Sequence, residues 1–117
     1  MSGLTTHVLD LSHGQPASHM KVKLYYSEAQ EWQLIKTVVT NSDGRLNEPL
    51  LSENEVKIGT YELVFHVGDY FRSKNIELQN PAFLEQVPVR FGIANLKHHY
   101  HVPLLISPWG YQVYRGS

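Results

Sequence analysis

The sequence contains no cysteine, and this absence removes several kinds of chemistry at once. Disulfide bonds, thiolate nucleophiles and cysteine-based zinc sites are all excluded. Any catalytic chemistry must therefore use other side chains, and histidine, with seven copies in 117 residues, is the first candidate.

The chain also lacks an excess of charge of one sign and any long apolar run. Its formal net charge is -1, so no basic surface for nucleic acid or an anionic membrane is expected. The longest apolar runs, such as "VPLLI", are far shorter than the ~18 residues of a membrane span. No charged-then-apolar leader precedes "SGLTTHVLDL" and no Ser-Lys-Leu ending is present, which predicts a mature cytoplasmic protein.

What the chain does contain is typical of one compact domain. Residues 1–117 leave no room for a second core, and 42% hydrophobic with 18% charged residues is ordinary for a globular fold. Neither a glycine-rich phosphate loop nor a G-x-S-x-G nucleophile motif is present.

Alternation of apolar and polar residues, interrupted by turn formers, predicts short β-strands. The segment 68–75 is expected to form one or two helical turns, with Asp69 as a cap, and the Asp-Gly pair in "NSDGR" predicts a tight turn that presents Arg45 where a new strand begins. Seven or eight strands with one short helix predict an all-β fold of two packed antiparallel sheets. The predicted strands cover residues 4–12, 20–27, 31–40, 60–67, 87–94, 99–107 and 111–116.

Three of the seven histidines crowd into "HHYH" at 98–101. On a strand His99 and His101 share one face, about 6.5–7 Å apart at their α-carbons, while Tyr100 lies on the other face. This spacing suits either a metal pair or two imidazoles around one bound molecule. Zinc needs a further protein ligand, so the pair alone does not establish a metal site.

Other polar residues have both an ordinary and a functional interpretation. His7 lies mid-strand in "LTTHVLDL", where a histidine is more often a hydrogen-bonded structural residue than a catalyst. Asp10 is expected to form hydrogen bonds at a strand end. Tyr114 and Arg115, close to the end of the chain, are able to cap a sheet edge.

Four segments together carry a family resemblance: "LTTHVLDLSHGQPA", "SDGR", "GDYF" and "HYHVPLLISPWGYQVYRGS". In this order they resemble the transthyretin-related proteins, over essentially the whole chain. The closing Tyr-Arg-Gly-Ser is similar to the signature of the enzyme branch, the 5-hydroxyisourate hydrolases, whereas the hormone-carrying transthyretins end differently.

The resemblance implies a transthyretin-like two-sheet β-sandwich with one short helix, assembled as a homotetramer, a dimer of dimers, with active sites where the dimers face each other. It implies hydrolysis of 5-hydroxyisourate to 2-oxo-4-hydroxy-4-carboxy-5-ureidoimidazoline in urate catabolism, by histidine-assisted attack of water on a ring amide. No cofactor or metal is expected. By the family's motifs, the catalytic residues are His7, Arg45, His101 and Ser117, and the substrate-binding residues are His99, Tyr114, Arg115 and Gly116.

Two positions depart from the family's pattern. Gln112 and Val113 stand where the family commonly has Ser-Thr, and Gln112, on the face of Tyr114 by strand period, is able to alter the pocket lining. His98 is not a motif position. Two alternatives remain at this point: a transthyretin-like carrier of a small ligand, and a metalloenzyme that uses His99, His101 and a third histidine.

Overall fold

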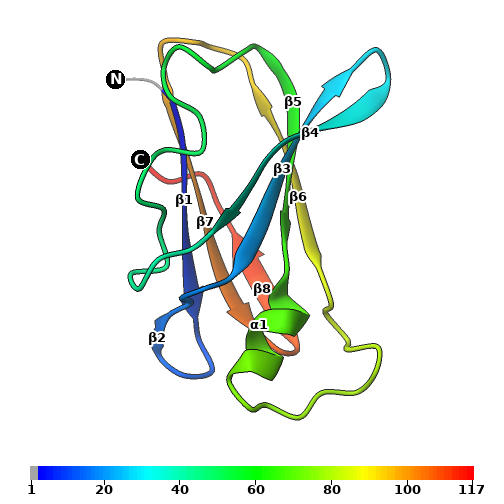
Figure 1. Ribbon diagram of the computed structural model, residues 1–117. Coiled ribbons are helices and arrows are strands. Elements are labelled where there is room, and N and C mark those ends of the chain that lie inside the picture. The colour runs from blue at the N-terminus through cyan, green and yellow to red at the C-terminus, as the bar shows by residue number, and fades with distance from the viewer. Residues whose placement is uncertain (1–2) are drawn as a thin grey trace.

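The computed structural model describes residues 3–117 as two four-stranded sheets packed face to face (Figure 1). One sheet has the strand order β2-β1-β7-β8 and the other β4-β3-β5-β6. The predicted two-sheet β-sandwich with one short helix is therefore confirmed. In chain order the elements are β1 (Gly3–Asp10), β2 (Gln15–Pro16), β3 (Lys21–Glu28), β4 (Glu31–Val39), β5 (Gly59–Phe65), α1 (Val67–Ser73), β6 (Val87–Ile93), β7 (His99–Ser107) and β8 (Gly110–Val113).

The prediction of purely antiparallel sheets was wrong for one pair of strands. β1 and β7 run parallel, in register from Gly3 opposite His99 to Asp10 opposite Ile106. The whole second sheet lies between them in the chain, which supplies the long crossover that parallel neighbours require. Alternation of side chains has the same period in either direction, so the sequence pattern carried no information on this point.

The core lies between the two sheets and is built from the inward-facing residues of every long strand except β4, whose residues are mostly exposed. In β1 the buried residues Leu4, Thr6, Val8 and Asp10 alternate with half-buried ones, as a pleated strand with one covered face requires. Leu104 and Ile106 of β7 continue the same layer. Opposite them, the second sheet contributes Val22, Leu24, Tyr61, Leu63, Phe65, Val89 and Ile93.

β1 ends at Asp10, two residues before the predicted end. The buried Asp10 carboxylate accepts hydrogen bonds from the backbone N–H groups of Ser12 and His13, at 3.0 and 3.1 Å, and from the Tyr70 hydroxyl at 2.8 Å. Burial raises the pKa of Asp10, but hydrogen bonds from Ser12, Tyr70 and His13 together hold it below its ordinary value. Asp10 is thus the strand-end hydrogen bonder that was expected, and it also fastens α1 to β1.

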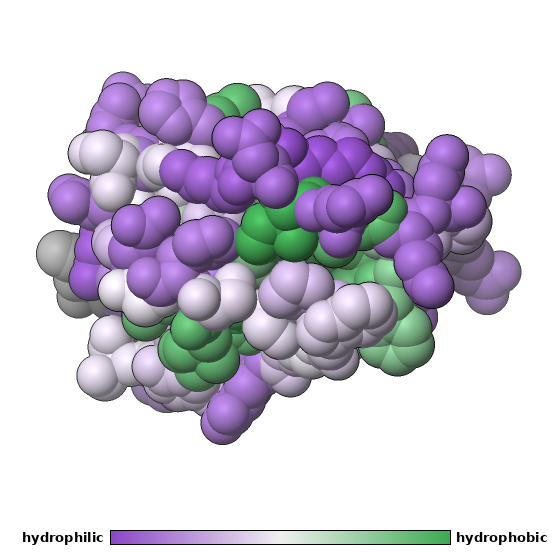
Figure 2. All heavy atoms as spheres, turned by 90° about the horizontal axis from the view of Figure 1, so that it is seen from below, coloured by the Kyte–Doolittle hydropathy of each residue, from purple (hydrophilic) through white to green (hydrophobic). Residues whose placement is uncertain are grey.

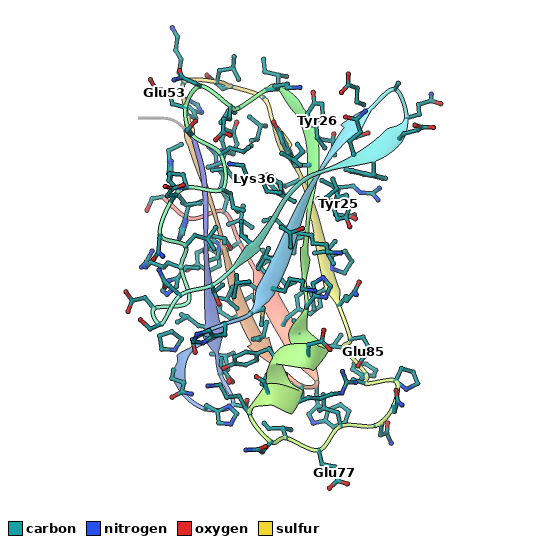
Figure 3. All side chains as sticks on the ribbon, in the orientation of Figure 1. Tyr25, Tyr26, Lys36, Glu53, Glu77 and Glu85 are labelled. Carbon is teal, nitrogen blue, oxygen red and sulfur yellow. The ribbon has the colours of Figure 1, made fainter. Side chains whose placement is uncertain are left out.

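α1 follows β5 directly and closes one end of the sandwich. Its buried residues are Val67, Gly68, Tyr70 and Phe71. Glu85 lies beside the helix (Figure 3) and pairs with Arg72. Asp69 does not cap the helix as expected: it lies in the first turn, 3.4 Å from Arg72.

Apolar side chains reach the surface at this end of the molecule, between mainly polar ones (Figure 2). Phe83 and Trp109 are both mostly exposed, with ring centroids 6.0 Å apart. Within residues 3–117, no helix has the length and apolar character needed to cross a lipid bilayer.

Two further boundaries differ from the prediction. No strand begins at Arg45 in the described chain; the segment after it is irregular and contacts β1 through an isolated bridge between Leu51 and Leu4. β8 ends at Val113, so Tyr114 and Arg115 follow the strand rather than extend it, and Gly116 forms an isolated bridge with His101.

Candidate active site

The outer face of the β2-β1-β7-β8 sheet carries the predicted histidines. β1 and β7 turn Thr5, His7, His99 and His101 away from the core, while Tyr100 is buried on the inner face, as the alternation predicted. The register places Thr5 directly opposite His101. His7 is two residues further along β1, a step of about 6.6 Å on a neighbouring strand, so the two imidazoles belong to one cluster.

Arg45 reaches this face because the turn of residues 41–45 packs against β1. Gly44 has a φ of 73°, and a Cβ at this position would lie 2.3 Å from the carbonyl oxygen of Val8. The Val8 N–H also donates a 2.8 Å hydrogen bond to the Gly44 carbonyl. Only glycine permits both the positive φ and this close approach. The turn therefore holds Arg45 near His7, from a position far away in the sequence.

His7 is held in one tautomer by the same turn. Its Nε2 lies 2.9 Å from the carbonyl oxygen of Asp43, which is only an acceptor, so Nε2 carries the proton. In the neutral ring Nδ1 is then a free lone pair. Burial, followed by the nearby Arg45 charge, lowers the pKa of His7 below its ordinary value.

A cavity of about 230 Å³ opens beside this cluster, lined by Thr5, Thr6, Arg45, His99, His101 and Ser117. Burial lowers the pKa of His101, and the charges of Arg45, His99 and His7 lower it further, against an opposing hydrogen bond with the Thr5 backbone. Both His7 and His101 are therefore predominantly neutral near pH 7, which keeps one lone pair available on each ring.

The last residues of the chain cover one edge of His101. The Gly116 N–H donates a 2.8 Å hydrogen bond to the His101 carbonyl. A Cβ on Gly116 would lie 2.6 Å from Cδ2 of the His101 ring, so this position has no space for a larger residue. The contact brings Ser117 into the lining of the cavity.

Tyr114 and Arg115 lie elsewhere in the isolated chain. They line a second cavity, of about 370 Å³, between β6 and the β7–β8 pair. Arg115 stacks over the ring of Tyr100 at 4.3 Å. The structure thus brings Arg45, His99, His101 and Ser117 into one cavity with His7 beside it, and it does not bring Tyr114 or Arg115 into that cavity.

Sequence reasoning missed two groups at the site. The Thr5 hydroxyl lies 2.8 Å from Nδ1 of His101 and 3.1 Å from Nε2 of His99, and the Asp43 carbonyl orients His7. Thr5 shares the face of His7 by strand period, which was the available signal; a backbone carbonyl leaves none. Within residues 3–117, no three His, Asp, Glu or Cys side chains are placed to hold a metal ion.

The fold and site define a class of protein: a transthyretin-like sandwich that carries histidines and an arginine on an outer sheet face. Residues 4–116 match the HIUase/Transthyretin family, and the chain belongs to it. It is 60% identical over 114 residues to 5-hydroxyisourate hydrolase 2 of Rhizobium meliloti, covering 97% of this chain and 95% of that protein. It is 53% identical over 117 residues to 5-hydroxyisourate hydrolase of Pseudomonas aeruginosa, covering 100% and 93%.

Solved structures agree on the fold. Sea bream transthyretin, in complex with thyroxine, superposes with a TM-score of 0.87 at 28% identity, covering 97% of this chain and 93% of that one. (S)-Allantoin synthase superposes with a TM-score of 0.92 at 45% identity over 99% of this chain. The chain spans 44% of the length of that protein. The predicted transthyretin-like architecture is therefore confirmed.

Replacing Arg45 by glutamine should raise the pKa of both His7 and His101, because the guanidinium charge opposes protonation of each ring. The measurement is an NMR titration of the imidazole Cε1 protons. Arg90→Gln, on β6 of the other sheet, is the matched control and should leave both pKa values unchanged. Unchanged or lower pKa values in Arg45→Gln would contradict the electrostatic role of Arg45.

Proposed function

We propose that His7, Arg45, His101 and Ser117 carry out the hydrolysis of 5-hydroxyisourate, the activity in urate catabolism of the relatives that match this chain over nearly their whole length. One observation supports this most directly. The neutral His101 imidazole and the permanently charged Arg45 guanidinium line a small polar cavity, the neutral His7 imidazole lies beside it, and each group has a form suited to one part of an amide hydrolysis.

Opening a ring amide with water makes three demands. Water must lose a proton as its oxygen bonds to the carbonyl carbon, the resulting oxyanion must be stabilised, and the ring nitrogen must gain a proton when the C–N bond breaks. No electrons are transferred, and the proton lost by water is the one that the nitrogen gains. Side chains and water are sufficient for these three steps, and the product is 2-oxo-4-hydroxy-4-carboxy-5-ureidoimidazoline.

His7 is the general base in this mechanism. Its Nε2–H is engaged by the Asp43 carbonyl, which leaves Nδ1 as the lone pair that accepts the proton from water. Its lowered pKa keeps Nδ1 unprotonated at neutral pH. The imidazolium formed then gives the same proton to the leaving ring nitrogen, so His7 acts first as a general base and then as a general acid.

Arg45 and His101 stabilise the oxyanion. The Arg45 guanidinium is always charged and offers a planar fork of N–H donors to a carbonyl oxygen. His101, neutral because of burial and the nearby Arg45 charge, contributes a ring N–H rather than a full charge. A neutral imidazole in this position leaves the pKa of His7 unchanged, whereas an imidazolium there would lower that pKa further and make His7 a weaker base.

The terminal residues and His99 bind the substrate. Ser117 lines the cavity, where its hydroxyl or its carboxylate is available to orient the attacked ring, and Gly116 holds Ser117 there through its contact with His101. His99 closes another side of the same cavity. Tyr114 and Arg115 line the second cavity in a single chain, so their contribution to binding requires the neighbouring subunits of the assembly proposed next.

The proposed assembly is a homotetramer, a dimer of dimers. β6 and β8 are edge strands of the two sheets, and they flank the same cavity, so both leave backbone groups unpaired on one side of the molecule. Pairing with a second copy along this side satisfies them. The outer sheet face, where Leu11 is 59% exposed and Leu105 is half-buried beside the histidines, then faces a second dimer.

A carrier is the alternative function on this fold, because the sea bream protein of the same architecture is a transthyretin solved with thyroxine. A carrier of such a ligand is expected to offer apolar lining. The cavity here offers histidine, arginine, threonine and serine side chains. Incubation with freshly oxidised urate, followed by ultraviolet absorbance, separates the two functions, since a carrier leaves the decay of 5-hydroxyisourate at its spontaneous rate.

His7→Asn and His101→Asn should each lower kcat by about 10²–10⁴-fold, because each removes a group acting on the transferred proton or on the oxyanion. The measurement is the initial rate of 5-hydroxyisourate decay at pH 7. His19→Asn, at an exposed position between β2 and β3, serves as the control and should retain the rate. Wild-type rates in both test variants would exclude this assignment of the histidines.

Gly116→Ala should lower kcat/KM by up to about 10²-fold, because the added methyl group displaces either the His101 ring or Ser117, and small displacements of this kind have such effects. Gly110→Ala is the matched control: no atom lies within 4 Å of a Cβ at that position. Equal rates for the two alanine variants would show that the tight contact at Gly116 has no part in the reaction.

Light scattering should give a mass of about 54 kDa, four chains of 13.4 kDa. Leu105→Lys, which places a charge on the outer face of β7, should lower this mass to that of a dimer by charge repulsion between the facing dimers. Leu34→Lys, at an exposed position of β4, should remain tetrameric. A wild-type mass of one chain would rule out the assembly.

A further inference from the structure

The Thr5 hydroxyl lies between two imidazoles of the candidate site. Its Oγ1 is 2.8 Å from Nδ1 of His101 and 3.1 Å from Nε2 of His99, and all three side chains are half-buried on the outer sheet face. A hydroxyl has one proton to donate and lone pairs with which to accept. When it bonds to two neutral rings, it donates to one and accepts from the other, so the chain of hydrogen bonds has a direction.

The surroundings of His99 determine that direction. Nδ1 of His99 is buried and has no hydrogen-bond partner within residues 3–117. If Thr5 donated to Nε2 of His99, the neutral ring would carry its proton on Nδ1 and leave a buried N–H without an acceptor. Orphaned buried N–H groups are rarer in proteins than orphaned acceptors. The favoured arrangement therefore has Nε2–H of His99 donating to Thr5, and leaves a bare lone pair on the buried nitrogen.

We infer that Thr5 is a positioning residue that fixes the tautomer of His101 by relaying a hydrogen bond from His99. The Thr5 proton then points to Nδ1 of His101, so the neutral His101 ring carries its own proton on Nε2. No hydrogen bond of this Nε2 to another group is found within the described residues, which leaves Nε2–H available to a molecule in the cavity.

This inference rests on the proposed function and adds to it that His7 and His101 have different roles in the reaction. His7 presents a lone pair because a carbonyl holds its other nitrogen, whereas His101 presents an N–H because a hydroxyl donates to its other nitrogen. Two chemically identical side chains thus become a base and an oxyanion donor. The proton moved in the reaction passes from water to His7 and on to the leaving nitrogen; His101 keeps its proton throughout.

The inference also assigns a reason for a hydroxyl at position 5. Valine has nearly the shape of threonine and suits a strand equally well, but it has neither donor nor acceptor. With valine, Nδ1 of His101 is no longer required to be the acceptor, and His99 loses the partner of Nε2. Serine keeps the hydroxyl and should preserve the relay.

The experiment measures the His101 ring nitrogens by ¹⁵N NMR and the kcat for 5-hydroxyisourate, in the wild type, Thr5→Val, Thr5→Ser and the control Thr37→Val on exposed β4. The wild type should show Nε2–H with an unprotonated, hydrogen-bonded Nδ1. Thr5→Val should shift both nitrogens toward a mixture of tautomers and lower kcat about tenfold, the effect of losing one well-oriented hydrogen bond. Thr5→Ser and Thr37→Val should match the wild type in both measurements.

A wild-type spectrum with the proton on Nδ1 of His101 would overturn the inference, and so would a Thr5→Val protein with unchanged nitrogen shifts. The wild-type spectrum alone can overturn the inference, so the test remains decisive even if the Thr5→Val protein does not fold. Failure of the proposed function has a different signature: the wild type would not hydrolyse 5-hydroxyisourate, while the nitrogen shifts would still report whether Thr5 sets the tautomer.

Discussion

The site depends on the parallel, in-register pairing of β1 with β7. This pairing places Thr5 opposite His101 and keeps His7 on the same outer face. Because side chains alternate, a slip of one residue in β7 would turn His99 and His101 into the core and put Tyr100 and Val102 on the surface. The buried inner face of β7 opposes such a slip, since each buried apolar side chain contributes roughly 1.5–3 kcal/mol. The energy that packs the core therefore also fixes the geometry of the histidines on the opposite face.

Arg45 has a second effect beyond binding. Its charge lowers the pKa of His7 and of His101, and burial of each ring acts in the same direction. Protonated His7 and His101 rings would be repelled by the guanidinium, so the neutral forms of these two rings are the stable ones at pH 7. Two hydrogen bonds then make the neutral rings different. The Asp43 carbonyl accepts a hydrogen bond from His7, whereas the Thr5 hydroxyl is able to donate one to His101. Charge sets the protonation state, and local hydrogen bonds set where the remaining proton lies.

Much of this arrangement was predictable from local patterns in the sequence. Alternation placed His99 and His101 on one face, and the Asp-Gly turn correctly located the loop that carries Arg45. Asp10 was rightly expected at a strand end, although the end came earlier because its carboxylate binds the next backbone N–H groups. The direction of β1 relative to β7 was not predictable, since pleating has the same period in both directions. Tyr114 and Arg115 were assigned to the last strand, but the bridge of Gly116 to His101 draws the chain away from the β8 ladder. The role of Thr5 depends on pairing between residues 94 and 96 positions apart, which a single sequence does not reveal.

The chain shares its sandwich with a thyroxine-bound transthyretin, so the fold alone does not select hydrolysis; the side chains on one sheet face do. That face is only half-buried in a single chain, and there the hydrogen bonds to an oxyanion compete with bulk water. Electrostatic stabilisation of a developing charge is strongest where water is excluded and the donors are already oriented. In the proposed tetramer a second dimer covers this face, which lowers the local dielectric while leaving room for the one water that reacts. The separate pairing proposed along the β6 and β8 edges places Tyr114 and Arg115 between subunits rather than at a free edge. In the proposed tetramer, assembly and catalysis therefore have one physical basis: the outer sheet face that bears the histidines becomes an active site when another copy encloses it.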